Sequence, residues 1–217
     1  SRRGFWRVHE LFQEKNIPIT IFGVGMALEK NQDVCDAIKK VNYEVASHGW
    51  RWIDYQNVSK ALEKKHMKLA IQSMEKIFGQ RPLGWYTGRC SPNTRDLVIE
   101  DGGFLYDSDS YSDDLPYWEK RGKKKQLIIP YTLDNNDMRF ATNQGFNSGD
   151  QFYTYLKDSF DALYNEGKTN PKMMSVGLHC RLIGRPGRIQ SLRKFLDYVS
   201  KFDDVWTCKR IDIAKHW

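Results

Sequence analysis

The run Tyr43-Glu44-Val45-Ala46-Ser47-His48 predicts a short β-strand that ends in a histidine. The run Met173-Met174-Ser175-Val176-Gly177-Leu178-His179 repeats this pattern far downstream. The catalytic groups of α/β barrels lie just past the carboxyl ends of parallel strands. Each of the two histidines is therefore a candidate catalytic residue.

Strand-like and helical segments alternate outward from these two runs. The clearest helix covers residues 59–78, with Ser59 as a predicted N-cap and Gly79 as a stop signal. Further strands are predicted at 17–23, 84–87, 103–107, 127–132 and 205–207, and further helices around 5–12 and at 27–40, 93–101, 150–166, 186–200 and 209–216. This β-α alternation predicts a parallel sheet wrapped by helices, either an open sheet or a barrel. The 217 residues fit one domain.

Polar residues recur where the predicted strands end: His48, Tyr86, Asp107, Asp134 and His179. In a barrel these ends share one rim, so residues far apart in the sequence are expected to line one pocket. The other histidines, His9, His66 and His216, fall in helical segments and are expected to be structural or on the surface.

Composition narrows the classes of partner. The net charge of +7 comes from 34 basic and 27 acidic residues, so the two signs are mixed. No apolar stretch approaches the roughly 20 residues that a membrane span needs, and no membrane partner is expected. The basic run Lys120–Lys125 has the character of a phosphate or nucleic-acid patch, but no aromatic residue lies within it. A solvated loop is the favoured interpretation, and nucleic acid is not expected as a partner.

The cysteines, Cys35, Cys90, Cys180 and Cys208, are far apart and form no Cys-x-x-Cys pair. This spacing matches neither a zinc cage nor the disulfide framework of a small secreted protein. Free thiols in a reducing compartment are expected, with the cytoplasm as the default location.

A metal site at His48 would call for a second imidazole four residues on, but Trp52 stands there. The indole nitrogen is only a hydrogen-bond donor, so it cannot bind a divalent cation. The missing ligand at position 52 is compatible with a lost metal, a changed chemistry or a lost activity.

The chain resembles the polysaccharide deacetylase (NodB-homology) superfamily, and within it the metal-independent allantoinases of the PuuE type and related cyclic imide hydrolases. The matching segments are Ala46–Trp50, Arg81–Arg89, Gly103–Tyr111, Asp113–Trp118, Asn136–Thr142, Gln144–Asp150 and Ser175–Arg181. The resemblance implies a distorted (β/α) TIM-like barrel formed by one catalytic domain over residues 1–217. It also implies that the first strand, with its acidic motif, lies upstream of this chain.

The resemblance assigns roles to both histidines. In metal-dependent deacetylases an aspartate and two histidines hold zinc or a similar ion; His48 matches the first histidine, and Trp52 occupies the place of the second. His179 matches the general acid on a late strand. The subgroup is described as needing no metal, so no cofactor is expected. The alternative is a divalent metal such as zinc, with His48 as a ligand.

Opening a cyclic amide needs an activated water, oxyanion stabilisation and a proton for the departing nitrogen. His179 is expected to deliver the proton, and His48 to position water or donate to the oxyanion. The predicted substrate-binding residues are Trp52, Tyr86, Arg89, Asp113, Asp114, Asn136, Asp137 and Arg139. The arginines and Asn136 would hold carbonyl or ureido oxygens. Asp113 and Asp114 are equally well explained as turn residues.

Three functions remain open at this point. The first is metal-independent opening of allantoin or another cyclic ureide or imide, which an already strained and activated ring favours. The second is deacetylation of a polysaccharide such as chitin, in which Trp50, Trp52, Trp85 and Trp118 could serve as sugar platforms, although core or rim packing is the favoured interpretation of these tryptophans. The third is a binding module or inactive fragment. The resemblance also implies a homo-oligomer.

Overall fold

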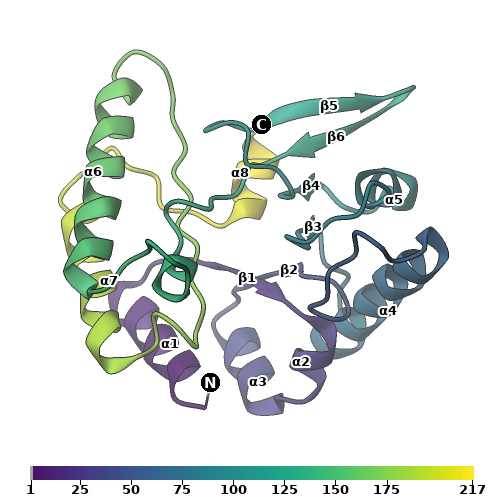
Figure 1. Ribbon diagram of the computed structural model, residues 1–217, viewed down its shortest axis with the longest axis horizontal. Helices are drawn as coiled ribbons and strands as arrows, with labels where there is room; N and C mark the ends of the chain where they lie inside the picture. The colour runs from purple at the N-terminus through teal and green to yellow at the C-terminus, as the bar shows by residue number, and fades with distance from the viewer. Residues whose placement is uncertain (1) are drawn as a thin grey trace. The chain divides into compact units, whose positions relative to one another are not determined.

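A computed structural model describes residues 2–217. They form two compact units, which are described separately (Figure 1). The first, here called the sheet unit, comprises Pro18–Pro130 and Cys208–Trp217. The second, here called the helical unit, comprises the segment that ends at Ile17 together with Tyr131–Thr207.

The sheet unit holds one six-stranded sheet in the order β1-β2-β3-β4-β6-β5. Its strands are β1 (Thr20–Gly23), β2 (Glu44–Ser47), β3 (Gly84–Trp85), β4 (Tyr106–Asp107), β5 (Tyr117–Arg121) and β6 (Lys124–Ile128). All neighbouring pairs are parallel except β5 with β6, which are antiparallel. The predicted mixed α/β class with a parallel sheet is confirmed.

The carboxyl ends of the five parallel strands β1, β2, β3, β4 and β6 are aligned by backbone hydrogen bonds. Each residue that follows a strand donates its N–H to the last residue of a neighbouring strand: His48 to Gly23 (2.8 Å), Tyr86 to Ser47 (2.9 Å), Ser108 to Trp85 (2.8 Å) and Ile129 to Asp107 (3.0 Å). We call this row the carboxyl edge. It places His48 and Tyr86 on adjacent strand ends, as the sequence predicts.

The helices of the sheet unit are α2 (Gly25–Glu29), α3 (Gln32–Lys40), α4 (Lys60–Phe78), α5 (Thr94–Asp101) and α8 (Arg210–His216). The Ser59 hydroxyl caps α4 by accepting from Leu62 N–H, and Gly79 ends it with φ of 76°. Side chains of α4 and α5 pack with β3 around Trp85 and Phe104. The prediction of one helix over 27–40 is wrong, because two residues outside the helices, Lys30 and Asn31, separate α2 from α3.

The predicted basic loop is instead the tip of a hairpin formed by β5 and β6, which projects as a two-stranded arm in Figure 1. Gly122 makes the turn with φ of 58°. Lys120 is paired with Lys125 across the strands, an arrangement of like charges that costs stability. Lysine-rich strands are uncommon, which explains why the pattern alone indicates a loop.

The helical unit contains α1 (Gly4–Lys15), the 3₁₀ helix η1 (Asp137–Ala141), α6 (Gly149–Gly167) and α7 (Pro186–Val199). Helices α6 and α7 pack side by side in Figure 1. The strands predicted at 173–179 and 205–207 are not present as such among the described residues. Gly177 instead makes a single parallel bridge with Asn136, which is enough to fix the backbone just before His179.

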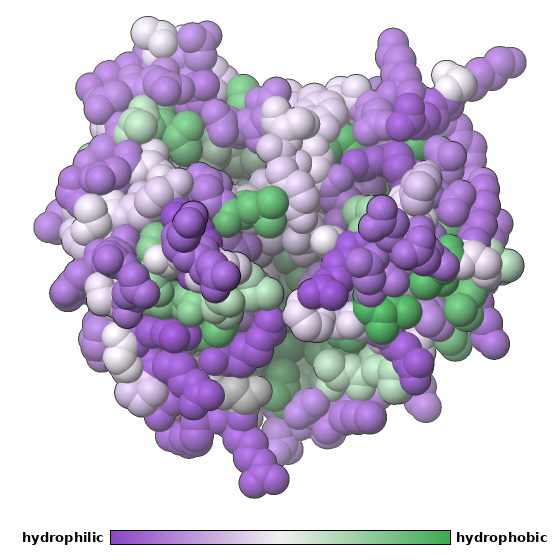
Figure 2. Space-filling model, in the orientation of Figure 1, coloured by the Kyte–Doolittle hydropathy of each residue, from purple (hydrophilic) through white to green (hydrophobic). Residues whose placement is uncertain are grey.

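None of the helices formed by residues 2–217 combines the length and the hydropathy that crossing a bilayer requires. The face shown in Figure 2 is mostly hydrophilic, and its hydrophobic residues appear in small separate patches. Exposed apolar side chains scattered in this way are normal for a protein surface.

Candidate active site

His48 is held by the strand end next to its own. Its Nδ1 lies 3.0 Å from the backbone oxygen of Tyr86. A carbonyl oxygen only accepts, so Nδ1 carries the proton, and in the neutral ring Nε2 is an acceptor. The ring also stacks on Tyr86, with centroids 5.0 Å apart and an interplanar angle of 30°. These contacts fix both the tautomer and the orientation of the imidazole.

Tyr86, predicted to bind substrate, is mostly buried, with 8% of its surface exposed. Its ring packs 4.8 Å from that of Phe22, and its hydroxyl lies 3.0 Å from the hydroxyl of Tyr111. Tyr86 therefore supports the His48 ring by stacking against it, and its role in substrate binding stays a prediction.

Trp52, at the position where a metal ligand would be expected, faces a cation. The Arg89 guanidinium carbon lies 4.3 Å from the centre of the Trp52 ring. An indole face attracts a guanidinium through the ring quadrupole. Trp52 is 44% exposed, so this pair of predicted binding residues lies at the surface, open to a ligand.

The residues around His48 do not fit a divalent cation. Among residues 2–217, no three His, Cys, Asp or Glu side chains are grouped so as to hold one. Within that described part of the chain, Trp52 stands where a second imidazole would be needed, and its ring is covered by the positive charge of Arg89.

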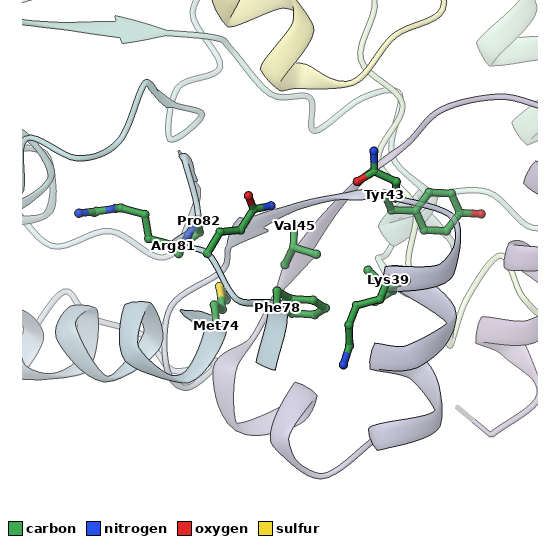
Figure 3. A pocket seen from close by; sticks show the side chains of 10 residues that line it. Lys39, Tyr43, Val45, Met74, Phe78, Arg81 and Pro82 are labelled. Carbon is green, nitrogen blue, oxygen red and sulfur yellow. The ribbon is translucent and has the colours of Figure 1, made fainter. Parts of the chain in front are cut away.

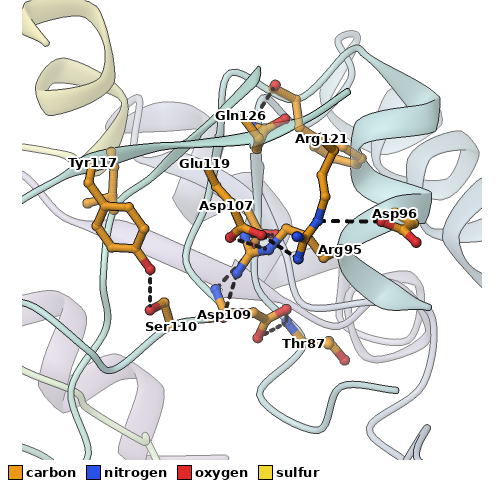
Figure 4. A network of polar contacts seen from close by, with 12 residues as sticks. Thr87, Arg95, Asp96, Asp107, Asp109, Ser110, Tyr117, Glu119, Arg121 and Gln126 are labelled. Atoms are coloured by element: carbon orange, nitrogen blue, oxygen red, sulfur yellow. Dashed lines mark hydrogen bonds and ion pairs between the residues drawn. The ribbon is translucent and has the colours of Figure 1, made fainter. Parts of the chain in front are cut away.

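Figure 4 shows a network of charges beside the carboxyl edge that the sequence did not reveal. Asp107, at the end of β4, is fully buried and pairs with Arg95 at 2.5 Å. Two residues on, the Asp109 carboxylate accepts N–H bonds from Thr87 and Gly88. Burial, and then the charge of Asp109, raise the pKa of Asp107 to about 8. Burial likewise raises the pKa of Asp109.

Both carboxylates lie in one Asp-x-Asp segment, which follows a predicted strand. Asp107 carries a sequence signal only as a polar strand end, and Asp109 carries none beyond its place two residues later.

In the helical unit, the Asp137 carboxylate holds His179. Oδ1 accepts from His179 Nδ1 at 2.6 Å, while Oδ2 accepts the backbone N–H groups of His179 at 2.8 Å and Ile183 at 2.9 Å. Asp137 is completely buried, whereas the His179 side chain is 25% exposed. A buried carboxylate on one ring nitrogen leaves the other nitrogen to exchange protons.

Asp137 and His179 are brought together because the backbone at Asn136 and Asp137 lies close to the backbone at Gly177. Asp137 N–H donates to the carbonyl of Gly177 at 2.9 Å, next to the bridge between Asn136 and Gly177. A Cβ at position 177 would lie 2.4 Å from the Asn136 amide nitrogen and 2.6 Å from the Tyr131 hydroxyl. Only glycine fits between these groups, so Gly177 helps set the position of His179.

Two other predicted binding residues of this unit have internal partners. The Asn136 side chain accepts from Met138 N–H at 2.9 Å and donates to the Thr132 carbonyl at 3.1 Å. Arg139 lies between aromatic rings, 4.4 Å from the Phe146 centroid and 4.5 Å from that of Tyr155. Substrate contacts by Asn136 and Arg139 stay predictions.

Asp113 and Asp114 lie in the exposed segment that precedes β5. The Asp113 carboxylate accepts from Leu115 N–H at 3.1 Å, as a turn residue does. This contact favours the structural interpretation of Asp113 over the binding one.

A cavity of about 150 Å³ lies near the amino ends of β2 and β3, opposite the carboxyl edge (Figure 3). Its lining comes from the carboxyl ends of α3 and α4 and from segments that lead into β2 and β3, and includes Lys39, Asn42, Val45, Phe78 and Arg81. Pockets for small ligands usually measure roughly 300–1,000 Å³. None of the predicted site residues lines this cavity.

Comparisons with known proteins agree with the geometry. Residues 2–99 match the family model described as polysaccharide deacetylase. A curated relative from Schizosaccharomyces pombe, assigned provisionally to the polysaccharide deacetylases, is 44% identical over 234 residues, which span 100% of this chain and 73% of the relative.

Two solved structures cover all of this chain with 56% identity and a TM-score of 0.97. One is described as a probable polysaccharide deacetylase from Pseudomonas aeruginosa PAO1, of which the match covers 73%. The other is described as Puue allantoinase, of which it covers 72%. These matches confirm the predicted NodB-type (β/α)-barrel fold class.

Proposed function

The chain belongs to the polysaccharide deacetylase family and is a hydrolase of that group, and from this premise we propose that it opens a cyclic amide without a metal ion. The proposed substrate is allantoin, which would yield allantoate, or a related cyclic ureide or imide. The 56% identity to a structure described as Puue allantoinase supports this choice.

The observation that carries the proposal is the environment of Trp52. An indole stands where a second imidazole would complete a metal site, and the Arg89 guanidinium lies on its face. A fixed guanidinium offers paired N–H donors to a carbonyl or carboxylate oxygen. Arg89 thus supplies positive charge for the substrate's oxygens without a divalent cation.

The pair of Asp137 and His179 provides the proton chemistry. In hydrolysis the water oxygen adds to the ring carbonyl carbon, the C–N bond breaks, and the departing nitrogen gains a proton. The ring amide and one water thus become a carboxylic acid and an N–H group. With Nδ1–H directed to Asp137, the His179 Nε2 can deliver that proton, while the carboxylate balances the charge on the ring.

For His48, the tautomer favours one of its two predicted roles. Because Nδ1–H donates to the Tyr86 carbonyl, the neutral ring presents Nε2 as an acceptor. An acceptor orients a water molecule through the water's own proton. We therefore assign His48 to positioning water.

The second candidate function is deacetylation of N-acetylglucosamine units in chitin. The provisional assignment of the fission yeast relative favours it, and so does the exposure of Trp52 (44%) and Trp118 (43%), which makes both available as sugar platforms. Trp85, in contrast, is buried at 3% and is a packing residue.

The test sets the two reactions side by side with one protein preparation. Ring opening is measured by the appearance of allantoate from allantoin, and deacetylation by acetate release from chito-oligosaccharides. The proposal predicts allantoate formation that falls sharply in His179→Gln, with no acetate released. Acetate release without ring opening would establish the second candidate, and inactivity in both assays would favour a binding module.

A further inference from the structure

We infer that Asp109 is a positioning residue for Arg89, holding the backbone turn from which the Arg89 side chain extends. The inference rests on the proposed function, in which Arg89 binds the oxygens of the substrate. It adds a residue that the sequence did not single out, and it names the group through which that residue acts.

The Asp109 carboxylate fixes the turn at Thr87 and Gly88 through hydrogen bonds to their backbone N–H groups. Oδ1 accepts Thr87 N–H at 3.0 Å and Gly88 N–H at 2.7 Å, and Oδ2 accepts Thr87 N–H at 2.9 Å. Gly88 has φ of 67°, a value that side chains other than glycine rarely adopt. Two successive N–H groups around such a residue form a concave anion site, and here Asp109 fills it. Arg89 is the next residue along the chain.

Asp109 is itself fixed on the other side (Figure 4). Its backbone N–H donates to Asp107 at 2.8 Å, and its backbone carbonyl accepts from the Arg95 guanidinium at 2.8 Å. Arg95 in turn pairs with Asp107 and lies 3.4 Å from Glu119 of β5. Contacts with residues of α5, β4 and β5 therefore fix the position of Asp109, and with it the turn at Thr87 and Gly88.

Arg89 has two further contacts that complete the arrangement. Its backbone carbonyl accepts from Tyr55 N–H at 3.1 Å, and its guanidinium lies on Trp52. A mobile arginine side chain loses rotamer entropy when a ligand fixes it, and this loss weakens binding. A turn fixed by Asp109 and a side chain held against Trp52 reduce that loss before the ligand arrives.

This role differs from a purely structural one in a measurable way. If Asp109 acts through Arg89, its substitution matters only while Arg89 can bind substrate. If it merely stabilises the fold, its effect adds to that of any Arg89 substitution, as for independent sites.

The first experiment is a double-mutant cycle on allantoin opening with Asp109→Asn, Arg89→Met and the double variant. Asp109→Asn is expected to raise KM about tenfold, the effect of losing a charge-assisted hydrogen bond, with a much smaller change in kcat. In the Arg89→Met background the same substitution should change KM less than about twofold. Equal effects in both backgrounds would overturn the inference.

Asp101→Asn is the matched control. Asp101 also accepts a backbone N–H, from Gly103 at 3.1 Å, and pairs with Arg81 at 2.5 Å, but it ends α5 away from the turn. It should leave KM unchanged. A rise in KM equal to that of Asp109→Asn would assign the effect to general loosening of the fold.

The second experiment needs no activity. Amide hydrogen exchange, followed by NMR, should show Thr87 and Gly88 protected in the unmodified protein, and about tenfold faster exchange at both in Asp109→Asn but not in Asp101→Asn. Unprotected amides in the unmodified protein would overturn the inference even if the variant fails to fold. If the protein opens no cyclic amide, the exchange rates still show whether Asp109 fixes the turn at Thr87 and Gly88. Failure of the proposed function can therefore be distinguished from failure of the inference.

Discussion

The two candidate catalytic histidines are held by different kinds of partner. His48 directs Nδ1 to a neutral backbone carbonyl and lies on an aromatic ring, whereas His179 directs Nδ1 to a buried carboxylate. A carbonyl fixes the tautomer but adds no charge, while a carboxylate also balances the charge of a protonated ring. The difference supports the proposed division of roles, in which His48 orients water and His179 delivers the proton.

The largest effect is expected from Asp137→Asn. This variant keeps the shape of the side chain but removes the charge and one acceptor from His179. We expect kcat for ring opening to fall about 10³-fold or more, because the imidazole loses its tautomer and its charge partner. The unpaired N–H should also cost about 1–3 kcal/mol in the free energy of unfolding, measured with urea.

Asp134→Asn serves as the control for that loss. Asp134 lies on the same loop and accepts from the Thr132 hydroxyl at 2.7 Å, without contacting His179. Its kcat should stay within about twofold of the unmodified protein, since a weak exposed contact is all that changes. A kcat near normal in Asp137→Asn would show that the carboxylate does not set the chemistry of His179.

A smaller effect is expected from His48→Asn, which keeps an N–H donor for the Tyr86 carbonyl. Loss of a group that orients water should lower kcat about 10²-fold, the usual effect of removing one preorganised polar contact. Steady-state rates for His48→Asn and Asp137→Asn, measured together, put the two histidines on one scale. Losses of equal size would remove the distinction between them.

The buried carboxyl group of Asp107 makes the stability of the fold depend on pH. Asp107 has its pKa raised from 3.8 to about 8, by burial and then by the charge of Asp109. Between these two values the unfolded chain has released the proton that the folded chain keeps, so stability should fall as pH rises through this window. Urea midpoints measured from pH 5 to 8 should decline, and Asp107→Asn should flatten the decline. An unchanged slope in the variant would assign the proton to another group.

The smallest effect is expected from Trp52→Leu. Removing an exposed cation–π contact of about 0.5–1 kcal/mol should raise KM for allantoin roughly two- to fivefold with little change in kcat. Trp118→Leu is the control, since Lys125 lies over that exposed ring at 4.1 Å in the same manner. If Trp118→Leu instead weakens turnover of chito-oligosaccharides, the sugar-platform interpretation gains support.

Periodicity and caps predict much of the fold. The helix at 59–78 is found with both of its predicted caps, and the strand ending at His48 lies where the alternation places it. The predictions fail where tertiary contacts outweigh local pattern. The lysine-rich β5–β6 hairpin reads as a loop, and the apolar run before His179 is held by one bridge rather than by a full strand.

The candidate site is predictable to a smaller extent, because its contacts join distant segments. Asp137 and His179 both carry sequence signals, but their pairing depends on a bond across 42 positions. Trp52 is conspicuous as a missing ligand, yet no local pattern shows that Arg89 covers it. Asp109 has no signal beyond its place after a strand, since its partners are the backbone groups of another turn.

The central claim is hydrolysis without a metal ion, and it is tested most directly by measuring allantoin opening before and after exhaustive chelation, with elemental analysis of the same samples. If the reaction needs no metal, kcat stays unchanged in protein that contains less than stoichiometric metal. Activity that disappears with the chelator and returns when zinc is added would contradict it.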